Sequence, residues 1–249
     1  MRARRSSFVL AAVAAVMFGP FVGTSLADDT PPDPCVTPPP GAIVGTSGND
    51  VLVGTSGPDV IVGLGGDDII YGLGGDDMIL GCAGNDTIYA GDGNDTIAGD
   101  DVSFFGGPNV TGDNDFIDAG RGDDQVLAGP GDDVVDAGPG NDFVAGAQGN
   151  DTIDLGPGDD QAIGGQGTDT LSGGPGNDAM FGGPGSDQLN GGPGDDLLVG
   201  DSPGPDPENP LPPTVDLNPN TDVCSGAIGT DESTTCEVNT SIEATLPAP

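Results

Sequence analysis

Histidine and tryptophan are absent from the chain, and only 4 of its 249 residues are lysine or arginine. Without histidine, a Ser-His-Asp triad, a Cys-His pair and an H-E-x-x-H zinc motif are all excluded. Adjacent carboxylates such as Asp67-Asp68 and Asp159-Asp160 match a glycosidase pair in residue type alone. We interpret each pair as sequence neighbours in a turn rather than as a catalytic pair, and we expect a protein that is not an enzyme.

The shortage of positive charge leaves the chain strongly acidic. Its 41 aspartate and glutamate residues give a formal net charge of −37, and Arg2, Arg4 and Arg5 all lie at the extreme N-terminus. A surface of this kind repels nucleic acid and anionic membranes and attracts cations. A disordered acidic chain has a similar composition, but the strict periodicity described below argues against disorder.

Long apolar runs are missing except near the N-terminus. There, a basic segment, 1–7, precedes an apolar segment, 8–22, and a small-x-small site, 25–27. This order predicts a cleavable secretory signal peptide, 1–27, and hence a secreted, extracellular protein. A membrane span needs about 20 apolar residues, and the apolar segment 8–22 is shorter than that. We therefore expect no membrane span once the signal peptide has been removed. An uncleaved helical anchor and, from Arg4-Arg5, twin-arginine export are the alternatives.

Glycine, in contrast, is abundant, and its 47 residues mark a nine-residue repeat that occurs sixteen times. The clearest copies read GGPGNDAMF, 173–181, and GGPGDDLLV, 191–199. Position 8 is apolar in every copy, and position 4 is glycine in every copy except that of Asp113. Position 5 is mostly asparagine or aspartate, residue types that tolerate left-handed turns. The period therefore predicts a regular structure built from one repeated unit.

Each unit is expected to form a glycine-rich turn of about six residues and a three-residue strand. The β-branched and aliphatic residues at position 8 suit a short buried strand, but one such strand cannot stand alone. Two units make one coil, and stacking the coils in parallel pairs their backbones and buries position 8. The sequence thus predicts an all-β parallel β-roll, a β-helix solenoid of about eight two-repeat coils, roughly 40 Å long at ~4.8 Å per strand.

The repeats set the boundaries of the other segments. An insertion that contains Phe104-Phe105 separates the sixth copy from the seventh; we expect it to cap an apolar edge of the roll, and an exposed binding loop is the alternative. We interpret the C-terminal tail, with its degenerate turn at Gly229-Thr230-Asp231, as a cap for the solenoid end. The expected organisation is a signal peptide, 1–27, a proline-rich linker, 28–44, the repeat domain, 45–200, with its insertion loop, 99–111, a proline-rich loop, 201–221, and a Cys-flanked cap and tail, 222–249.

Position 6 is aspartate in all sixteen copies, and stacking would place these carboxylates one strand spacing apart. Their repulsion requires a counter-charge, which the scarce lysine and arginine cannot supply. Calcium fits because it binds six to eight oxygen atoms of carboxylates and backbone carbonyls, whereas magnesium keeps its waters in a strict octahedron; zinc and copper are disfavoured without histidine or a thiol cluster. We predict several bound calcium ions and no other cofactor. The candidate metal ligands are Asp50, Asp59, Asp68, Asp77, Asp86, Asp95, Asp115, Asp124, Asp133, Asp142, Asp151, Asp160, Asp169, Asp178, Asp187 and Asp196.

In this repeat the chain resembles the repeat-in-toxin (hemolysin-type) family, whose nonapeptide G-G-x-G-x-D-x-U-x forms a calcium-binding parallel β-helix. The resemblance implies that calcium lies between turns of neighbouring coils, bound by the position-6 aspartates and by backbone oxygens of the preceding glycine turn. Three departures are expected to weaken sites. They are Asp113 in place of a glycine, the insertion, which would interrupt stacking between Asp95 and Asp115, and the Thr-Ser pair of early copies such as 45–53.

Four cysteines remain, and export would permit disulfide bonds. Four cysteines allow three pairings, of which we prefer the local pair Cys224–Cys236. A second bond, Cys35–Cys82, would then attach the N-terminal linker to the repeats.

Together these features predict a secreted calcium-binding repeat protein that binds several calcium ions between adjacent coils and folds or becomes rigid on binding. The alternative is a calcium-stabilised extracellular adhesive or structural spacer protein. Its contacts, with an extracellular surface or with a second copy of the chain, would be apolar strand residues such as Val51, Val53, Tyr71 and Tyr89, together with the loop of Phe104-Phe105.

Overall fold

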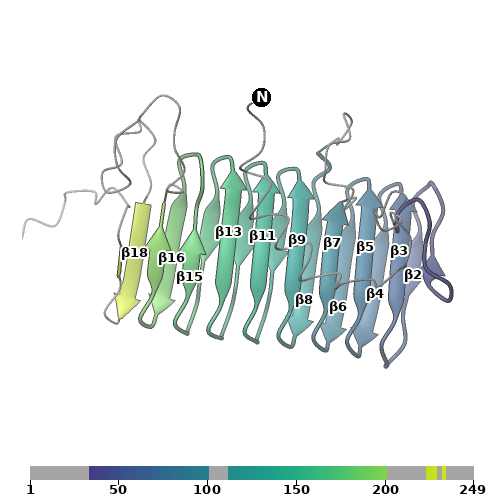
Figure 1. The fold of residues 1–249 in the computed structure, drawn as a ribbon, viewed down its shortest axis with the longest axis horizontal. Helices are drawn as coiled ribbons and strands as arrows, with labels where there is room; N and C mark the ends of the chain where they lie inside the picture. Colours follow the sequence, from purple (N-terminus) through teal and green to yellow (C-terminus); the bar gives the residue numbers. More distant parts are fainter. Residues whose placement is uncertain (1–33, 101–111, 201–222, 229–231, 234–249) are drawn as a thin grey trace, which may run out of the picture.

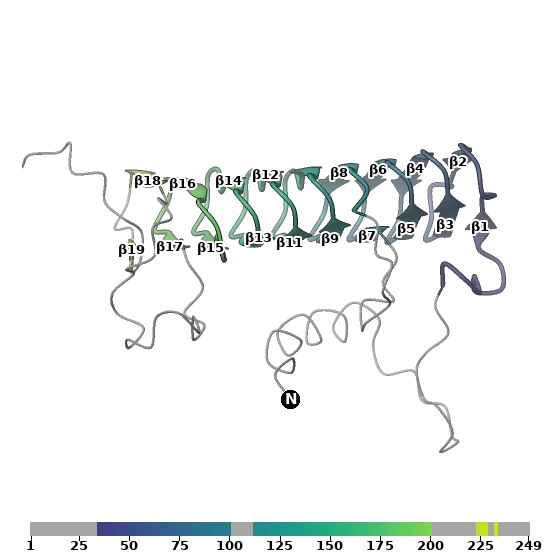
Figure 2. The same cartoon turned by 90° about the horizontal axis from the view of Figure 1, so that it is seen from above.

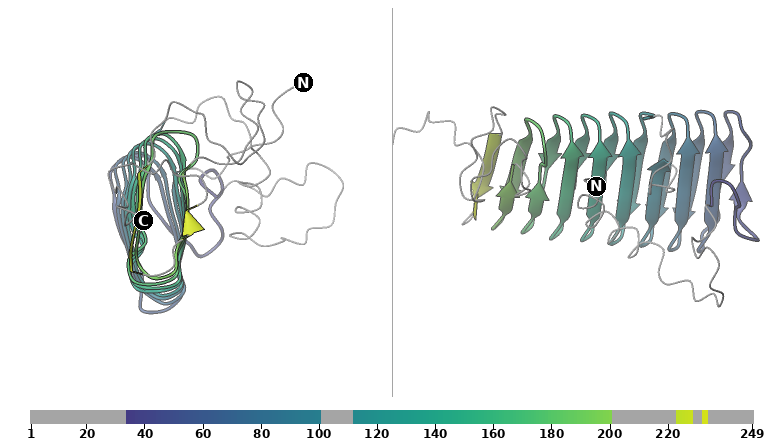
Figure 3. Two further views of the ribbon diagram at one scale, coloured as in Figure 1. Left: turned by 90° about the vertical axis from the view of Figure 1, so that its left-hand side faces the viewer. Right: turned by 45° about the horizontal axis from the view of Figure 1, so that its top comes forward.

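The computed structural model of the chain describes residues 34–100 and 112–200, together with the backbone of 223–228 and 232–233. The described chain winds into a parallel β-solenoid with a flattened cross-section (Figures 1 and 3). The predicted fold, an all-β parallel β-roll of about eight two-repeat coils, is confirmed. Within these residues, no helix has the length and hydropathy needed to cross a membrane. The predicted signal peptide and the proline-rich loop, 201–221, lie outside the described residues.

Two parallel sheets face each other across the core, and successive strands alternate between them (Figure 2). Sheet A holds Ile43–Val44 (β1), Val60–Gly65 (β3), Met78–Ala83 (β5), Thr96–Asp100 (β7), Gln125–Pro130 (β9), Phe143–Gln148 (β11), Gln161–Gln166 (β13), Ala179–Phe181 (β15), Leu197–Val199 (β17) and Glu232–Ser233 (β19). Sheet B holds Val51–Val53 (β2), Ile69–Gly74 (β4), Thr87–Asp92 (β6), Phe116–Arg121 (β8), Val134–Asp136 (β10), Thr152–Asp154 (β12), Thr170–Ser172 (β14), Gln188–Pro193 (β16) and Val223–Ile228 (β18).

The register of the strands explains the repeat. Each strand pairs with the strand one coil further on, as in Ile61↔Ile79, so the position-8 side chains stack in one column per sheet. They are buried and form one apolar cluster between the sheets. The smallest of them is Ala162, and Leu155, at position 1 of the same unit, is buried in that cluster as well. Leu155 therefore adds apolar volume in the coil where position 8 supplies least.

The strands are longer than the three residues expected from the repeat. Several continue through positions 1 to 3 of the next unit, as β3 does to Gly65. Three-residue strands such as β12 and β14 precede turns with proline at position 3, Pro157 and Pro175. Proline at this position does not by itself shorten the strand, because β9 and β16 continue through it, to Pro130 and Pro193.

The left-handed residues lie at positions 2 and 4 of the turn, not at position 5. At position 2, Leu64 and Leu73 have φ of 79°, and no position-5 residue in the described segments has positive φ. The tolerance of asparagine and aspartate for left-handed turns is therefore not used at position 5. Instead, these side chains join consecutive coils: the backbone N–H of Asn141 donates to Oδ1 of Asp123 at 2.8 Å, and that of Asp159 donates to Oδ1 of Asn141 at 3.0 Å.

The insertion leaves the roll from inside a turn and does not interrupt the stacking. Gly99 and Asp100, which the sequence pattern assigned to the insertion, end β7, and Asp100 pairs with Cys82 as a position-2 residue. Residues 101–111, with Phe104-Phe105, lie outside the described residues, and the chain resumes at Gly112. The register then continues as Ile88↔Ile117. The expected break between Asp95 and Asp115 was wrong because a loop that leaves from a turn does not alter the strand pairing.

The N-terminal segment covers part of the outer face of sheet A. Its anchor is the disulfide Cys35–Cys82, whose Cα atoms are 5.9 Å apart. Beside it, Val62, Leu80 and Ala98 are buried on the outer face. The Cys35–Cys82 bond is thus present, while the preferred pair Cys224–Cys236 falls outside the residues whose side chains are described.

Both ends of the roll extend beyond the sixteen repeats. At the start, β1, at the end of the predicted linker, pairs with β3. In the tail, β18 pairs with β16 and β19 with β17. In the sequence, Asp222 and Asp231 directly precede β18 and β19, as the position-6 aspartates precede the repeat strands. The described part of the tail therefore continues the coil pattern.

Candidate metal centre

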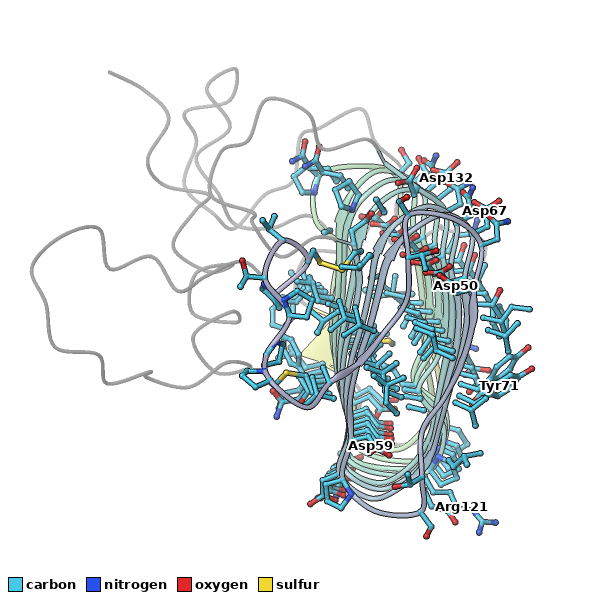
Figure 4. The ribbon with its side chains drawn as sticks, turned by 90° about the vertical axis from the view of Figure 1, so that its right-hand side faces the viewer. Asp50, Asp59, Asp67, Tyr71, Arg121 and Asp132 are labelled. Atoms are coloured by element: carbon cyan, nitrogen blue, oxygen red, sulfur yellow. A yellow bond between two sulfur atoms is a disulfide. The ribbon has the colours of Figure 1, made fainter. Side chains whose placement is uncertain are left out.

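The sixteen position-6 aspartates form two ladders along the roll. One ladder follows the turns that lead into sheet B and starts at Asp50; the other follows the turns that lead into sheet A and starts at Asp59. Asp50 and Asp59 lie inside the turns at opposite ends of the flattened cross-section (Figure 4). The predicted stacking, Asp50 over Asp68 and Asp59 over Asp77, is what the structure has.

From Asp68 and Asp77 onward, one oxygen of each ladder carboxylate accepts a hydrogen bond from the preceding coil. The backbone N–H of Asp68 donates to Oδ1 of Asp86 at 2.8 Å, and the backbone N–H of Asp142 donates to Oδ1 of Asp160 at 2.8 Å. The same bond crosses the insertion, from the N–H of Asp86 to Oδ1 of Asp115 at 2.7 Å. This contact orients every carboxylate in the same way along the ladder.

The other oxygen, Oδ2, is buried and accepts no hydrogen bond through most of both ladders. A buried carboxylate oxygen without a partner is strongly unfavourable, and a whole series of them indicates a missing ligand rather than a local defect. The twelve aspartates concerned are Asp68, Asp77, Asp86, Asp95, Asp115, Asp124, Asp133, Asp142, Asp151, Asp160, Asp169 and Asp178. Asp187 and Asp196, near the C-terminal end of the ladders, are buried too.

Burial makes these carboxylates weak acids when no cation is present. Desolvation, followed by the charges of neighbouring aspartates, raises the pKa of Asp86 to about 7, that of Asp115 to about 8 and that of Asp124 to about 7. Arg121 is the only basic residue of the described segments, and it lies exposed at the end of β8. The side chains of residues 34–100 and 112–200 therefore offer these carboxylates no counter-charge.

Backbone oxygens border the same space as the free carboxylate oxygens. A Cβ added to Gly63 would meet Oδ2 of Asp68 and would lie 2.6 Å from the carbonyl oxygen of Gly81, one coil further on. Gly146 stands in the same relation to Asp151 and to the carbonyl of Gly164. Carboxylate and carbonyl oxygens are the ligands that calcium prefers.

Side chains alone do not form the site. In the described part of the chain, no three carboxylate or cysteine side chains gather as a set that could hold a metal ion. A cation between coils would therefore take ladder carboxylates together with backbone carbonyls. The donor set fits a hard cation of flexible coordination number, and it lacks the imidazole and thiolate ligands that zinc and copper prefer.

The first coil differs from the others. Oδ2 of Asp50 accepts hydrogen bonds from the backbone N–H of Thr46, at 2.6 Å, and from its hydroxyl, at 2.8 Å. Oδ2 of Asp59 accepts one from the backbone N–H of Thr55 at 2.5 Å. In the Thr-Ser copies, for which weaker sites were predicted, the turn itself thus provides a donor for the oxygen that has none from Asp68 to Asp178.

One buried carboxylate was missed in the sequence. Asp100, at position 2 of the seventh unit, is 6% exposed, and its Oδ2 has no hydrogen-bond partner. Desolvation and the nearby charge of Asp115 raise its pKa to about 9. Counting the repeat from Gly99, rather than restarting it after the insertion, would have identified this position. In the same turn, Oδ2 of Asp113 accepts the N–H of Gly84 at 2.9 Å, so Asp113 has a role of its own in place of the usual glycine.

Fold and site together define a metal-binding parallel β-roll. The family model of the RTX calcium-binding nonapeptide repeat matches residues 44–79, 72–102, 110–144, 136–171 and 172–202, which is more than half of the chain. The chain therefore belongs to this family, and it is a calcium-binding repeat protein. A search of curated proteins found no match.

Proposed function

We propose that this chain is a secreted protein that binds several calcium ions between adjacent coils and that its β-roll folds or becomes rigid on binding them. The observation that carries the proposal is the series of twelve buried Oδ2 atoms without a hydrogen-bond partner. Calcium between two coils would bind these oxygens and neutralise the repulsion within each ladder.

The position-6 aspartates are the proposed ligands, with backbone carbonyls of the glycine turns completing each site. Each ladder has seven intervals between consecutive position-6 aspartates, from Asp50 to Asp187 and from Asp59 to Asp196. Sites that involve Asp50 or Asp59 are the weakest, because threonine already occupies one oxygen of each. Magnesium binds less well because it retains its waters and requires a strict octahedron.

Folding outside the cell follows from the calcium affinity expected of such a site. Extracellular modules bind calcium at roughly 10⁻⁴–10⁻³ M, so a chain in the cytosol would remain free of calcium and poorly folded. The disulfide Cys35–Cys82 supports an oxidising compartment, as does the signal peptide predicted over 1–27. Each site saturated a hundredfold would then add about 2.7 kcal/mol to the stability of the folded roll.

A calcium titration of the protein without its signal peptide, stripped with chelator and followed by far-ultraviolet circular dichroism, tests the proposal. We expect a cooperative gain of β signal at roughly 10⁻⁴–10⁻³ M calcium and none at the same concentration of magnesium. A β-rich spectrum that is the same in chelator and in calcium would show that the aspartates do not control folding.

A calcium-stabilised adhesive or spacer protein is the second candidate, favoured by apolar side chains on the outer face of sheet B. Val51 is 65% exposed, and the ring of Tyr71 stacks on that of Tyr89 with centroids 5.3 Å apart. Tyr71 points away from the core in Figure 4. Sedimentation of the calcium-loaded protein tests this function: self-association that Tyr71→Glu abolishes would support it, and a monomer at all concentrations would contradict association between copies.

A further inference from the structure

The turn that carries the insertion has more carboxylates than any other described turn. Asp100 occupies position 2, Asp113 position 4 and Asp115 position 6 of the seventh unit. At position 2, the other described units have leucine, glycine, alanine, cysteine or threonine. The extra negative charge is thus concentrated at one place in the roll.

Asp100 leans toward the next coil. A Cβ added to Gly129, the position-2 residue of that coil, would meet Oδ2, Cγ and Cβ of Asp100, with Cγ 3.0 Å away. Oδ2 of Asp100 nevertheless has no hydrogen-bond partner, and 94% of the residue's surface is buried. A carboxylate in this state needs either a proton or a cation.

The free oxygen of Asp115 lies at the same step between coils. A Cβ added to Gly99, the neighbour of Asp100 in the chain, would meet both Oδ2 of Asp115 and the carbonyl oxygen of Ala128, the neighbour of Gly129. Two unpartnered carboxylate oxygens and one backbone carbonyl therefore border a single step, whereas the other steps have only the ladder carboxylate and carbonyls. The affinity of a calcium site rises with the number of charged ligands.

We propose that Asp100 is a calcium ligand in addition to the sixteen position-6 aspartates, and that it acts with Asp115 to form the tightest site of the roll, between the seventh unit and the unit that begins at Ala128. This inference rests on the proposed calcium binding between coils and goes beyond it, because position 2 supplies no metal ligand in the repeat pattern. The roll then has one site that fills before the others, next to the insertion.

Competition calorimetry of the full protein, with calcium as the probe and a chelator of known affinity, tests this site. The test variant is Asp100→Asn, which keeps the shape of the side chain and removes its charge. The matched control is Asp118→Asn, which removes one charge from the same unit but at a position on the outer face of β8. We expect one tight binding constant in the wild type, weakened at least tenfold in Asp100→Asn and changed by less than about twofold in Asp118→Asn.

Each other outcome contradicts the proposal in a recognisable way. If Asp100→Asn keeps the tightest constant, or if all wild-type sites are equal, Asp100 is not a ligand, while calcium binding between coils stands. If Asp100→Asn shows no β signal even in saturating calcium, its role is structural rather than in binding. Absence of calcium binding by the wild type would remove the proposed function itself.

Discussion

The first coil and the coils that follow it have the same aspartate at position 6, but the second carboxylate oxygen meets different partners in the two regions. In the first coil, the backbone N–H groups of Thr46 and Thr55 donate to Asp50 and Asp59. From Asp68 onward, Oδ2 is buried and accepts no hydrogen bond as far as Asp178. The same residue is a local turn-forming group in the first coil and, from Asp68 to Asp178, a buried carboxylate with one unpartnered oxygen.

The difference originates at position 2. At Gly165 and Gly183 the N–H of this residue bonds to a carbonyl oxygen of the next coil, that of Gly182 at 2.8 Å and that of Gly200 at 2.7 Å. Position 2 then has positive φ, 119° at Gly165, whereas Thr46 and Thr55 are not among the residues with positive φ. The comparison shows that position 6 supplies the carboxylate in both regions, while only in the first coil does the residue at position 2 donate to its second oxygen.

Removing carboxylates from the two regions should have very different effects. Asp142→Asn with Asp160→Asn keeps the acceptors of the inter-coil hydrogen bonds but removes the charge at three consecutive intervals of one ladder. We expect a lower calcium stoichiometry and a loss of roughly 3 kcal/mol of calcium-dependent stability for each site removed. Calorimetry and denaturant unfolding in saturating calcium measure both quantities.

The matched control for the double variant at Asp142 and Asp160 is the pair Asp50→Asn with Asp59→Asn in the first coil. Here the amide oxygens can still accept the hydrogen bonds of the threonines, and we expect the calcium stoichiometry to fall by at most the two weakest sites. An equal loss of stability in both double variants would show that the two regions do not differ as the hydrogen bonds indicate.

Much of the fold could be predicted because the nine-residue period of the sequence determines the register in which neighbouring coils pair. A repeat that places an apolar residue every ninth position permits one stacking, in which Ile61 lies beside Ile79. The exit point of the insertion could not be predicted in this way, because the pattern restarts cleanly at Ala119 and conceals that Gly99 and Asp100 belong to a turn. The strand lengths were missed because they depend on hydrogen bonds of positions 1 to 3, where residue identity changes from unit to unit.

The candidate site was predictable in its residues but not in its chemistry. Every position-6 aspartate is readable from the sequence, and so is its place in a ladder. Whether Oδ2 of a given unit accepts a hydrogen bond depends on the direction of the N–H at position 2. The pair Thr46-Ser47 marks a unit with this bond, but the sequence alone does not give the turn geometry that shows it. Asp100 was missed because its place at position 2 is visible only when the seventh repeat is counted from Gly99, before the insertion.

The pH dependence of stability should reverse when calcium is removed. Burial raises the pKa of Asp86 to about 7 and that of Asp115 to about 8, from 3.8. Between about pH 4 and pH 8 the metal-free folded chain then holds more protons than the unfolded chain, so its stability falls as the pH rises through this range. With calcium the carboxylates are held ionised, and because protons compete for the same oxygens, the stabilisation by calcium grows as the pH rises.

Melting temperatures at pH 5 and pH 8, in chelator and in calcium, measure this reversal. Where the chelated protein is already unfolded at pH 8, recovery of β signal on acidification replaces the melt. A chelated protein that is more stable at pH 8 than at pH 5 would contradict the burial of uncompensated carboxylates after the first coil.

Within the first coil, the hydroxyl groups of the two threonines offer a smaller test. The hydroxyl of Thr46 donates to Oδ2 of Asp50 at 2.8 Å, whereas that of Thr55 contacts the carbonyl oxygen of Gly57 at 3.2 Å. Thr46→Val should therefore lower the unfolding free energy by about 1 kcal/mol, and Thr55→Val by less. Denaturant unfolding in calcium measures both, and a larger effect at Thr55 would be evidence against Thr46 as the group that replaces the cation.

The smallest expected effect concerns the left-handed backbone that separates the two regions. Leu73 is 53% exposed and has φ of 79° at position 2, where many other units have glycine. A left-handed conformation costs a non-glycine residue roughly 1–2 kcal/mol, and the added freedom of glycine in the unfolded chain offsets about 0.5–1 kcal/mol of that. Leu73→Gly should thus raise the unfolding free energy of the calcium-loaded protein by up to about 1.5 kcal/mol. Leu73→Ala, which retains the strain, should not. Thr46→Gly should lower the unfolding free energy, because Thr46 has no positive φ to relieve and the change removes the hydroxyl that donates to Asp50. Opposite signs for replacement by glycine at Leu73 and at Thr46 would confirm that the two turns differ in backbone conformation as well as in hydrogen bonding.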